Sequence, residues 1–85
     1  MSNSALSIPV TYRRREVEQL TRQSRSGLYA AMKDGTFPAS IRIGERAVVW
    51  LHDEVAAVMQ ARIRGASQDD IRELVASLHA KRTAA

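Results

Sequence analysis

The residues best suited to bind another molecule lie between Arg13 and Arg46. Residues 11–46 hold eight basic and four acidic side chains, and seven of the eight basic ones are arginines. The planar guanidinium group suits phosphate oxygens and guanine edges better than the point charge of a lysine does. This half of the chain therefore carries the whole formal charge of +4, because residues 47–85 hold five basic and five acidic side chains. The segregation favours a polyanionic partner. The alternative is that the uneven charge distribution arose by chance in so short a chain.

Catalytic and metal-binding constellations are absent from the sequence. There is no cysteine, which excludes disulfides and thiolate metal sites, and the two histidines, His52 and His79, have no spaced acidic partners. We expect no enzyme, no cofactor and no metal. No apolar run approaches the roughly 20 residues of a membrane span. The N-terminus lacks the basic and apolar regions of a secretory signal, so we expect a cytoplasmic protein without a membrane role.

Two short helices separated by a tight break are predicted in the basic half. The first covers residues 14–20, with Val17 and Leu20 pointing inward because they are three residues apart. The second covers residues 25–33. Ser24 precedes it and suits the N-cap, where its hydroxyl accepts an otherwise unpaired backbone N–H group.

The apolar period changes to two after the second helix. Ile41 and Ile43 alternate with Arg42, a turn containing "GER" follows, and the alternation resumes on the return. This pattern predicts a β-hairpin over residues 41–50. Arg42 and Arg46 should lie on its outside or at its tip.

Two further helices are predicted at residues 53–64 and 68–82, capped by Asp53 and Ser67. The expected apolar side of the former consists of Val55, Val58, Met59 and Ile63. The latter has an apolar stripe at helical spacing, formed by Ile71, Leu74, Val75 and Leu78. This stripe either closes the core of the domain or presents an apolar face to another copy or a protein partner.

Helix, tight break, helix, hairpin and helix is the order of a winged helix-turn-helix. The predicted fold class is mostly α with a small β-hairpin, arranged α-α-β-β-α, plus an extra C-terminal helix. We divide the chain into a flexible N-terminal arm (1–10), a winged helix-turn-helix DNA-binding domain (11–65) and a C-terminal amphipathic helix (66–85). In such units the N-terminal residues of the second helix point into the major groove of DNA.

This geometry accounts for a weak and basic first turn in the second helix. Gly27 inside a helix costs about 1 kcal/mol relative to alanine, but small residues allow the backbone to approach DNA closely. The positive end of the helix dipole also favours phosphate. The candidate DNA-binding residues are Arg22, Gln23, Ser24, Arg25, Ser26, Tyr29, Lys33, Arg42, Arg46, Arg13, Arg14 and Arg15. The structural alternative for residues 24–26 is an ordinary helix cap and solvated face, and for Tyr29 it is packing of its ring. For Arg42 and Arg46 it is the outward face of a hairpin, and for residues 13–15 it is a solvated basic run.

The sequence "EVEQLTRQSRSGLYAAMKDGTFPASIRIGERAVVWLHDEV" resembles the AlpA-type phage regulators and the related excisionases, which have a MerR-like winged helix-turn-helix. The resemblance covers residues 14–60. Matching positions are Glu16, Val17, Thr21, Ser24, Arg25, Ser26, Tyr29, Gly35, Phe37, Pro38, Gly44, Arg46, Trp50, Glu54 and Val55. The sequence departs from the family pattern where T-G-L is replaced by Thr21, Arg22 and Gln23, and where S-T is replaced by Ser26 and Gly27.

The resemblance implies a bacterial, nucleoid-associated protein of a prophage or mobile element that binds double-stranded DNA site-specifically without an enzymatic step. Such proteins act as transcription regulators, as excisionases (recombination directionality factors), or as both. Implied partners are a tyrosine integrase or RNA polymerase, and self-association on DNA is a further expectation. A small protein-interaction adaptor, using the basic face and the C-terminal helix, is the alternative.

Overall fold

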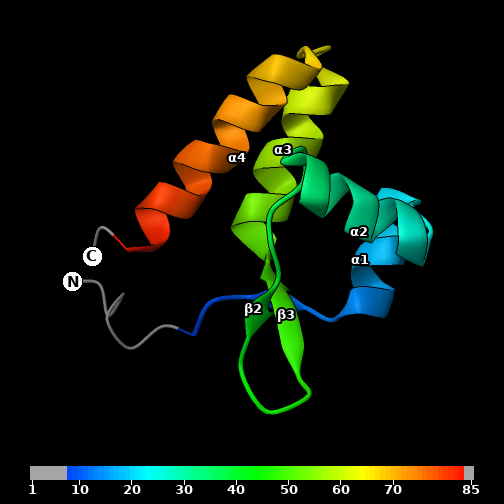
Figure 1. The fold of residues 1–85 in the computed structure, drawn as a ribbon, viewed down its shortest axis with the longest axis vertical. Coiled ribbons are helices and arrows are strands. Elements are labelled where there is room, and N and C mark those ends of the chain that lie inside the picture. The colour runs from blue at the N-terminus through cyan, green and yellow to red at the C-terminus, as the bar shows by residue number, and fades with distance from the viewer. Residues whose placement is uncertain (1–7, 84–85) are drawn as a thin grey trace.

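The computed structural model describes residues 8–83 and confirms the predicted fold class (Figure 1). The elements of the first half are β1 (Thr11–Tyr12), α1 (Arg14–Thr21) and α2 (Arg25–Asp34). They are followed by β2 (Ile41–Arg42), β3 (Val48–Leu51), α3 (His52–Ile63) and α4 (Gln68–Arg82). Residues 1–7 of the predicted N-terminal arm lie outside the described residues. Residues 8–10, which belong to the same predicted arm, are exposed.

The sheet of the described residues contains one strand more than the predicted hairpin. Its order is β1-β3-β2 with antiparallel pairing, and Tyr12 stands opposite Trp50 in the added pair. The strand β1 has only two residues, too few to show a period of two. Ile43 lies in the hairpin turn beyond the β2–β3 ladder and is 59% exposed, so its alternation in the sequence does not reflect burial.

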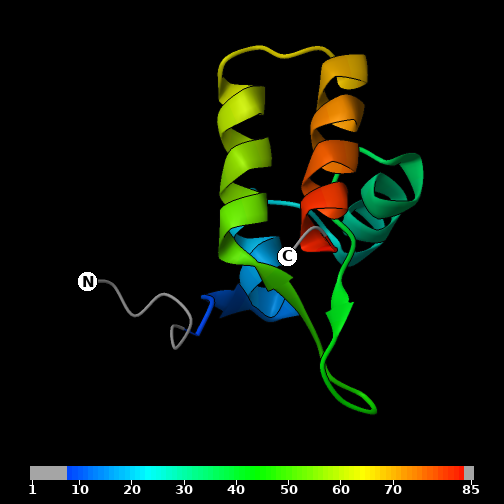
Figure 2. The same cartoon turned by 90° about the vertical axis from the view of Figure 1, so that its left-hand side faces the viewer.

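The core joins all four helices to the sheet. The buried cluster consists of Val17, Leu28, Phe37, Trp50, Val55, Val58, Ala61, Ile71 and Val75. The Trp50 side chain is fully buried, and its Nε1–H group donates to the carbonyl oxygen of Pro38 at 3.1 Å. Helices α3 and α4 run antiparallel, side by side (Figures 1 and 2). The apolar stripe of α4 therefore lies against the core of the molecule.

Three local predictions were wrong. Leu20 and Ile63 are 55% and 81% exposed rather than inward-facing. The inward stripe of α1 runs through Val17 and Thr21 instead, which places Leu20 on the outer side. Asp53 does not cap α3, because Leu51 occupies the N-cap position, the helix begins at His52 and Asp53 lies within its first turn.

Candidate nucleic-acid interface

The turn between α1 and α2 is closed by a left-handed residue. Arg22, which follows α1, has φ 58° and ψ 30°. The Thr21 hydroxyl donates to the carbonyl oxygen of Val17 at 2.7 Å and also lies 3.0 Å from Oε1 of Gln23. The turn is thus tight even though an arginine occupies the place where the family pattern has glycine. Because a hydroxyl group has a single hydrogen, Thr21 donates to one of these two oxygens at a time, and its contact with Gln23 keeps the Gln23 side chain close to the turn.

The first turn of α2 faces solvent. Ser24 caps the helix: its Oγ accepts from the Gly27 amide at 3.1 Å, and its carbonyl oxygen accepts from the Leu28 amide at 2.8 Å. Arg25 and Ser26 are exposed. Their backbone amides, the first two of the helix, have no acceptor within it. The turn therefore offers N–H donors, hydroxyl groups and a guanidinium group to a ligand.

Gly27 has a local role that the sequence did not reveal. A Cβ atom added at this position would lie 3.1 Å from Oγ of Ser24, closer than ordinary van der Waals contact. Glycine therefore leaves room for the capping hydroxyl. Room for the cap is thus a second explanation for Gly27, in addition to the predicted close approach of the helix backbone to DNA.

The rest of α2 packs on the core through Leu28, and the helix is followed by Gly35. Leu28 is fully buried. Gly35 takes φ 82° after the last residue, and its amide bonds the carbonyl oxygens of the final turn. Tyr29 is 39% exposed, and Lys33 is exposed. Lys33 lies about 13 Å along the helix axis from Ser24, taking a rise of 1.5 Å per residue.

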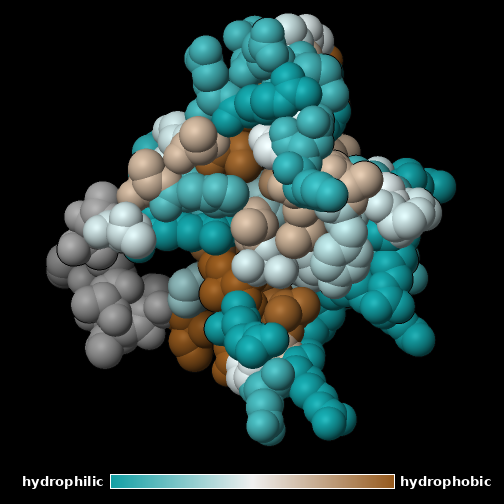
Figure 3. Space-filling model, viewed as in Figure 1, coloured by the Kyte–Doolittle hydropathy of each residue, from teal (hydrophilic) through white to brown (hydrophobic). Residues whose placement is uncertain are grey.

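The β2–β3 hairpin projects from the body of the molecule as a wing. Its turn is closed by the Ile43 amide, which donates to the carbonyl oxygen of Ala47 at 2.9 Å. Arg42 and Arg46 are exposed on it. Figure 3 shows hydrophilic side chains projecting from this lower end and from the side formed by α1 and α2, with apolar surface between them.

The arginines at the start of α1 lie next to the wing. Arg13, Arg14 and Arg15 line a surface groove together with Arg46 and Val48. Within it, Arg14 forms an ion pair with Glu18 on the same helix, and its side chain is 30% exposed. This pair neutralises Glu18, which would otherwise repel a phosphate.

A second depression extends this surface to α2. It is lined by Arg15, Glu18, Gln19, Arg22, Gln23 and Ser24. Arg15 belongs to both depressions, so the basic residues of α1, the turn and the wing share one connected surface. The sequence analysis missed Gln19. Gln19 lies four residues after Arg15, which places both side chains on one face of α1, and Arg22 joins them in the same depression from the turn. Five of the predicted site residues line neither depression: Arg25, Ser26, Tyr29, Lys33 and Arg42.

Two other kinds of site are not found within residues 8–83. No group of three or more His, Cys, Asp or Glu side chains there is arranged to hold a metal ion. None of the helices described there has the length and apolar character needed to cross a membrane.

The two helices, the tight turn, the exposed first turn of α2 and the wing define a winged helix-turn-helix protein. The model of the family described as "Prophage CP4-57 regulatory protein (AlpA)" matches residues 11–63, and the chain belongs to this family of phage regulatory proteins. The resemblance seen in the sequence is thereby confirmed. Helix α4 lies beyond the matched residues.

One relative comes from a phage. The chain is 44% identical over 50 residues to "Uncharacterized protein ORF88" of Enterobacteria phage P4. The aligned part is 59% of this chain and 57% of that protein, so the chain spans less than two thirds of the relative's length. No solved structure matches the chain.

Proposed function

We propose that this protein is a sequence-specific double-stranded-DNA-binding regulator of a prophage or other mobile element. Residues 24–33 would lie in the major groove, and the wing of residues 41–50 would contact the adjacent groove or backbone. The observation that carries the proposal is the open first turn of α2, where Ser24, Arg25 and Ser26 are exposed beside the basic surface. Helix α2 has 10 residues, and an α-helix with its side chains is about 10–12 Å across, which fits the major groove of about 12 Å width.

The proposed contacts divide into two kinds. Gln23 and Arg25 would read base edges, because they flank the helix N-terminus that would enter the groove. Arg13, Arg15 and Arg46 line the groove between α1 and the wing, where they would bind phosphates and position the protein. Arg14 would contribute less, since it is paired with Glu18.

A salt series on DNA binding tests this proposal. Neutralising about 4–6 phosphates gives a log–log salt slope of about −4 to −5. The duplexes to compare are the element's own promoter and attachment-site DNA and a random sequence of equal length. An absence of retardation at low salt, or affinity that does not respond to salt, would refute DNA binding.

Arginine substitutions separate base reading from phosphate binding. Arg25→Ala should reduce the preference for the target over random duplex, whereas Arg15→Ala should weaken both equally. Arg64→Ala is the matched control, because Arg64 is exposed at the end of α3 and lines neither depression. Equal losses on both duplexes for Arg25→Ala and Arg15→Ala would remove the recognition role of α2.

The finer proposal is that the protein acts as a transcription regulator, as an excisionase that assists a tyrosine integrase, or as both. Family membership supports the regulatory role, the phage P4 relative supports a phage origin, and the excisionase role rests on the resemblance seen in the sequence. Both roles rest on the same groove contacts, since bending DNA and recruiting RNA polymerase or an integrase require the protein to sit at its site. A footprint over an attachment site, with excision by the element's integrase that depends on this protein, would support the excisionase role. Protection of promoter DNA alone would support transcription regulation.

The structure weakens the alternative hypothesis of a protein-interaction adaptor. That hypothesis was motivated by the apolar stripe of α4, but Ile71 and Val75 are 1% and 3% exposed within the core. Self-association on DNA remains a proposal, and the stoichiometry of complexes on duplexes of increasing length would test it.

A further inference from the structure

Residues 35–40 connect α2 to the wing without regular secondary structure. Their path sets the position of the wing relative to α2, because no other covalent link joins the two directly. Side chains of α3 and α4 hold this connector at both ends. Those side chains are Arg62, Arg72, His79 and Arg82.

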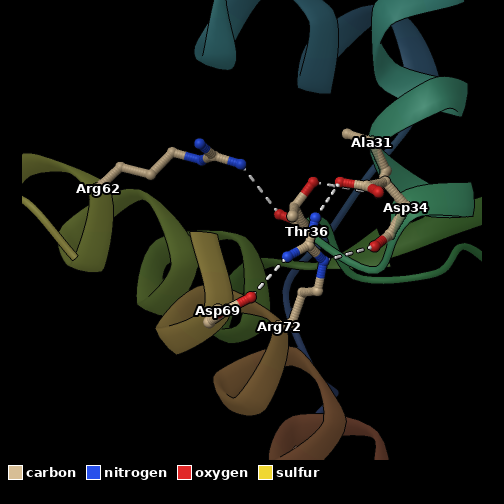
Figure 4. A network of polar contacts seen from close by, with 6 residues as sticks. All are labelled: Ala31, Asp34, Thr36, Arg62, Asp69 and Arg72. Carbon is tan, nitrogen blue, oxygen red and sulfur yellow. Dashed lines mark hydrogen bonds and ion pairs between the residues drawn. The ribbon is translucent and has the colours of Figure 1, made fainter. Parts of the chain in front are cut away.

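The end next to α2 is held by two arginines (Figure 4). From α4, Arg72 donates through Nε to the carbonyl oxygen of Asp34 at 3.1 Å and through Nη2 to the Asp34 carboxylate at 3.0 Å. A third bond, from Nη1 to Asp69 at 2.9 Å, orients the guanidinium group. From α3, Arg62 donates to the carbonyl oxygen of Thr36 at 3.1 Å. The hydrogen bond with Asp34 and the charge of its carboxylate raise the pKa of Arg72, so this guanidinium group stays protonated.

The end next to the wing is held at Ala39. Its amide donates to Nε2 of His79 at 3.0 Å, and its carbonyl oxygen accepts from Nη2 of Arg82 at 2.8 Å. The same guanidinium group donates through Nε to Oε2 of Glu54 at 2.8 Å and through Nη2 to Oε1. Both backbone polar groups of Ala39 thus bond side chains of α4.

The two attachments differ in burial. The side chains of Arg82 and Glu54 are 22% and 6% exposed, whereas those of Arg72 and Asp34 are 42% and 52% exposed. Exposed ion pairs contribute little and are screened by salt, while a charge-assisted, two-point bond in a shielded position is strong and directional. Arg82 is therefore the principal attachment, and Arg72 is the weaker one.

We propose that α4 is a brace that fixes the wing relative to the recognition helix, with Arg82 as a positioning residue for DNA recognition. The inference rests on the proposed function. Helix and wing must contact the duplex at the same time, and the second contact gains most from the first when the geometry of the wing is preset. The contacts of Arg82 and His79 reach backbone atoms of the connector, so they determine its path rather than merely covering it. The brace lies outside the residues that match the family.

A double-mutant cycle tests the brace. Replacing Arg82 alone would leave Glu54 buried without its cation, which is strongly destabilising, so the variant is the pair Arg82→Met with Glu54→Gln. Arg46→Ala is then introduced into the wild type and into this variant. Lys81→Met is the control, because Lys81 is an exposed cation of the same helix. Thermal unfolding curves identify a temperature at which all variants are folded, and DNA binding is compared at that temperature.

We expect the paired variant to bind target DNA about tenfold more weakly, within the range of coupling between interacting residues. Arg46→Ala should weaken binding in the wild type but have little effect in the paired variant, since a misplaced wing no longer reaches the duplex. A purely structural role would lower the melting temperature and leave the effect of Arg46→Ala unchanged, which would overturn the proposal. Lys81→Met should behave as the wild type in both measurements.

Amide hydrogen exchange separates the brace from the DNA-binding function. In the paired variant without DNA, the Ala39 amide should exchange faster. The variant removes the bond from Arg82 to the Ala39 carbonyl oxygen, so the hydrogen bond of the Ala39 amide to His79 is the remaining attachment at this end of the connector. Exchange as slow as in the wild type would overturn the brace even if DNA binding holds. Failure of the wild type to bind any duplex would instead overturn the proposed function, and the positioning role with it.

Discussion

Arg22 combines a strained backbone with a side chain on the candidate interface, so one substitution separates stability from DNA binding. Its φ of 58° is the only positive φ among the non-glycine residues of the described chain. The left-handed conformation costs an L-residue about 1–2 kcal/mol. Arg22→Gly removes this strain, because glycine adopts positive φ readily. Its guanidinium group lines the depression shared by α1 and the start of α2.

The expected gain in stability follows from two opposing effects. Relief of strain stabilises the folded state, while glycine raises the entropy of the unfolded chain by an amount worth about 0.4–1 kcal/mol. The net gain in the free energy of unfolding is therefore about 0.5–1 kcal/mol. For a domain of this size that corresponds to a rise of about 2–8 °C in Tm. In DNA binding, loss of one phosphate contact should reduce the magnitude of the log–log salt slope by about 0.9.

Arg22→Ala is the matched control, because it removes the same guanidinium group but keeps a Cβ atom in the left-handed conformation. We expect its Tm to lie at or below that of the wild type, and its DNA binding to match that of Arg22→Gly. Circular dichroism melts without DNA give the first quantity, and fluorescence anisotropy titrations over a salt series give the second. A glycine variant that melts no higher than the alanine variant would refute the strain. Wild-type salt slopes in both variants would refute the DNA contact.

Further predictions concern the capped turn and the core. Ser24→Ala removes the oxygen that accepts the Gly27 amide at 3.1 Å and should lower Tm by about 4–8 °C for a cap worth about 1 kcal/mol; an unchanged melt would show that the cap contributes nothing. Gly27→Ala should leave Tm nearly unchanged, because crowding against Ser24 Oγ offsets a gain of about 1 kcal/mol in helix propensity. The same variant should retard target DNA less in gel shifts, and unweakened binding would count against close approach of the helix backbone. Trp50→Phe removes the donor to the Pro38 carbonyl oxygen and should lower the unfolding free energy by about 2 kcal/mol or more, measured by urea denaturation; a wild-type midpoint would contradict this.

Most helices could be predicted because their signals are local. Ser24 and Ser67 each cap a helix through a hydrogen bond to an amide three residues later, an interaction encoded in a single turn. Gly35 and Gly65 take positive φ where the second and third helices end, as expected of glycine. The winged order of elements and the family resemblance followed from these signals together with the alternation in the hairpin.

The faces of the helices were less predictable. Apolar spacing placed Val17 correctly but also placed Leu20 and Ile63 inward, whereas both are exposed. A three-residue spacing restricts side chains to one broad side of a helix, and the neighbouring elements decide which part of that side is covered. The Nε2 atom of His79 accepts the Ala39 amide from 40 residues away, a contact that no local pattern indicates.

The sequence by itself determined the order of the helices, the serine caps of the second and fourth, which half carries the positive charge and which turn opens the second helix. These properties depend on residues within a few positions of one another, so the local chain is sufficient to encode them. Only the tertiary structure decided that β1 pairs with β3, that Arg46 lies beside the arginines of α1, and that Arg82 reaches the connector to the wing. Such contacts join residues far apart in the chain, and they exist only after packing of the shared core has brought their elements together.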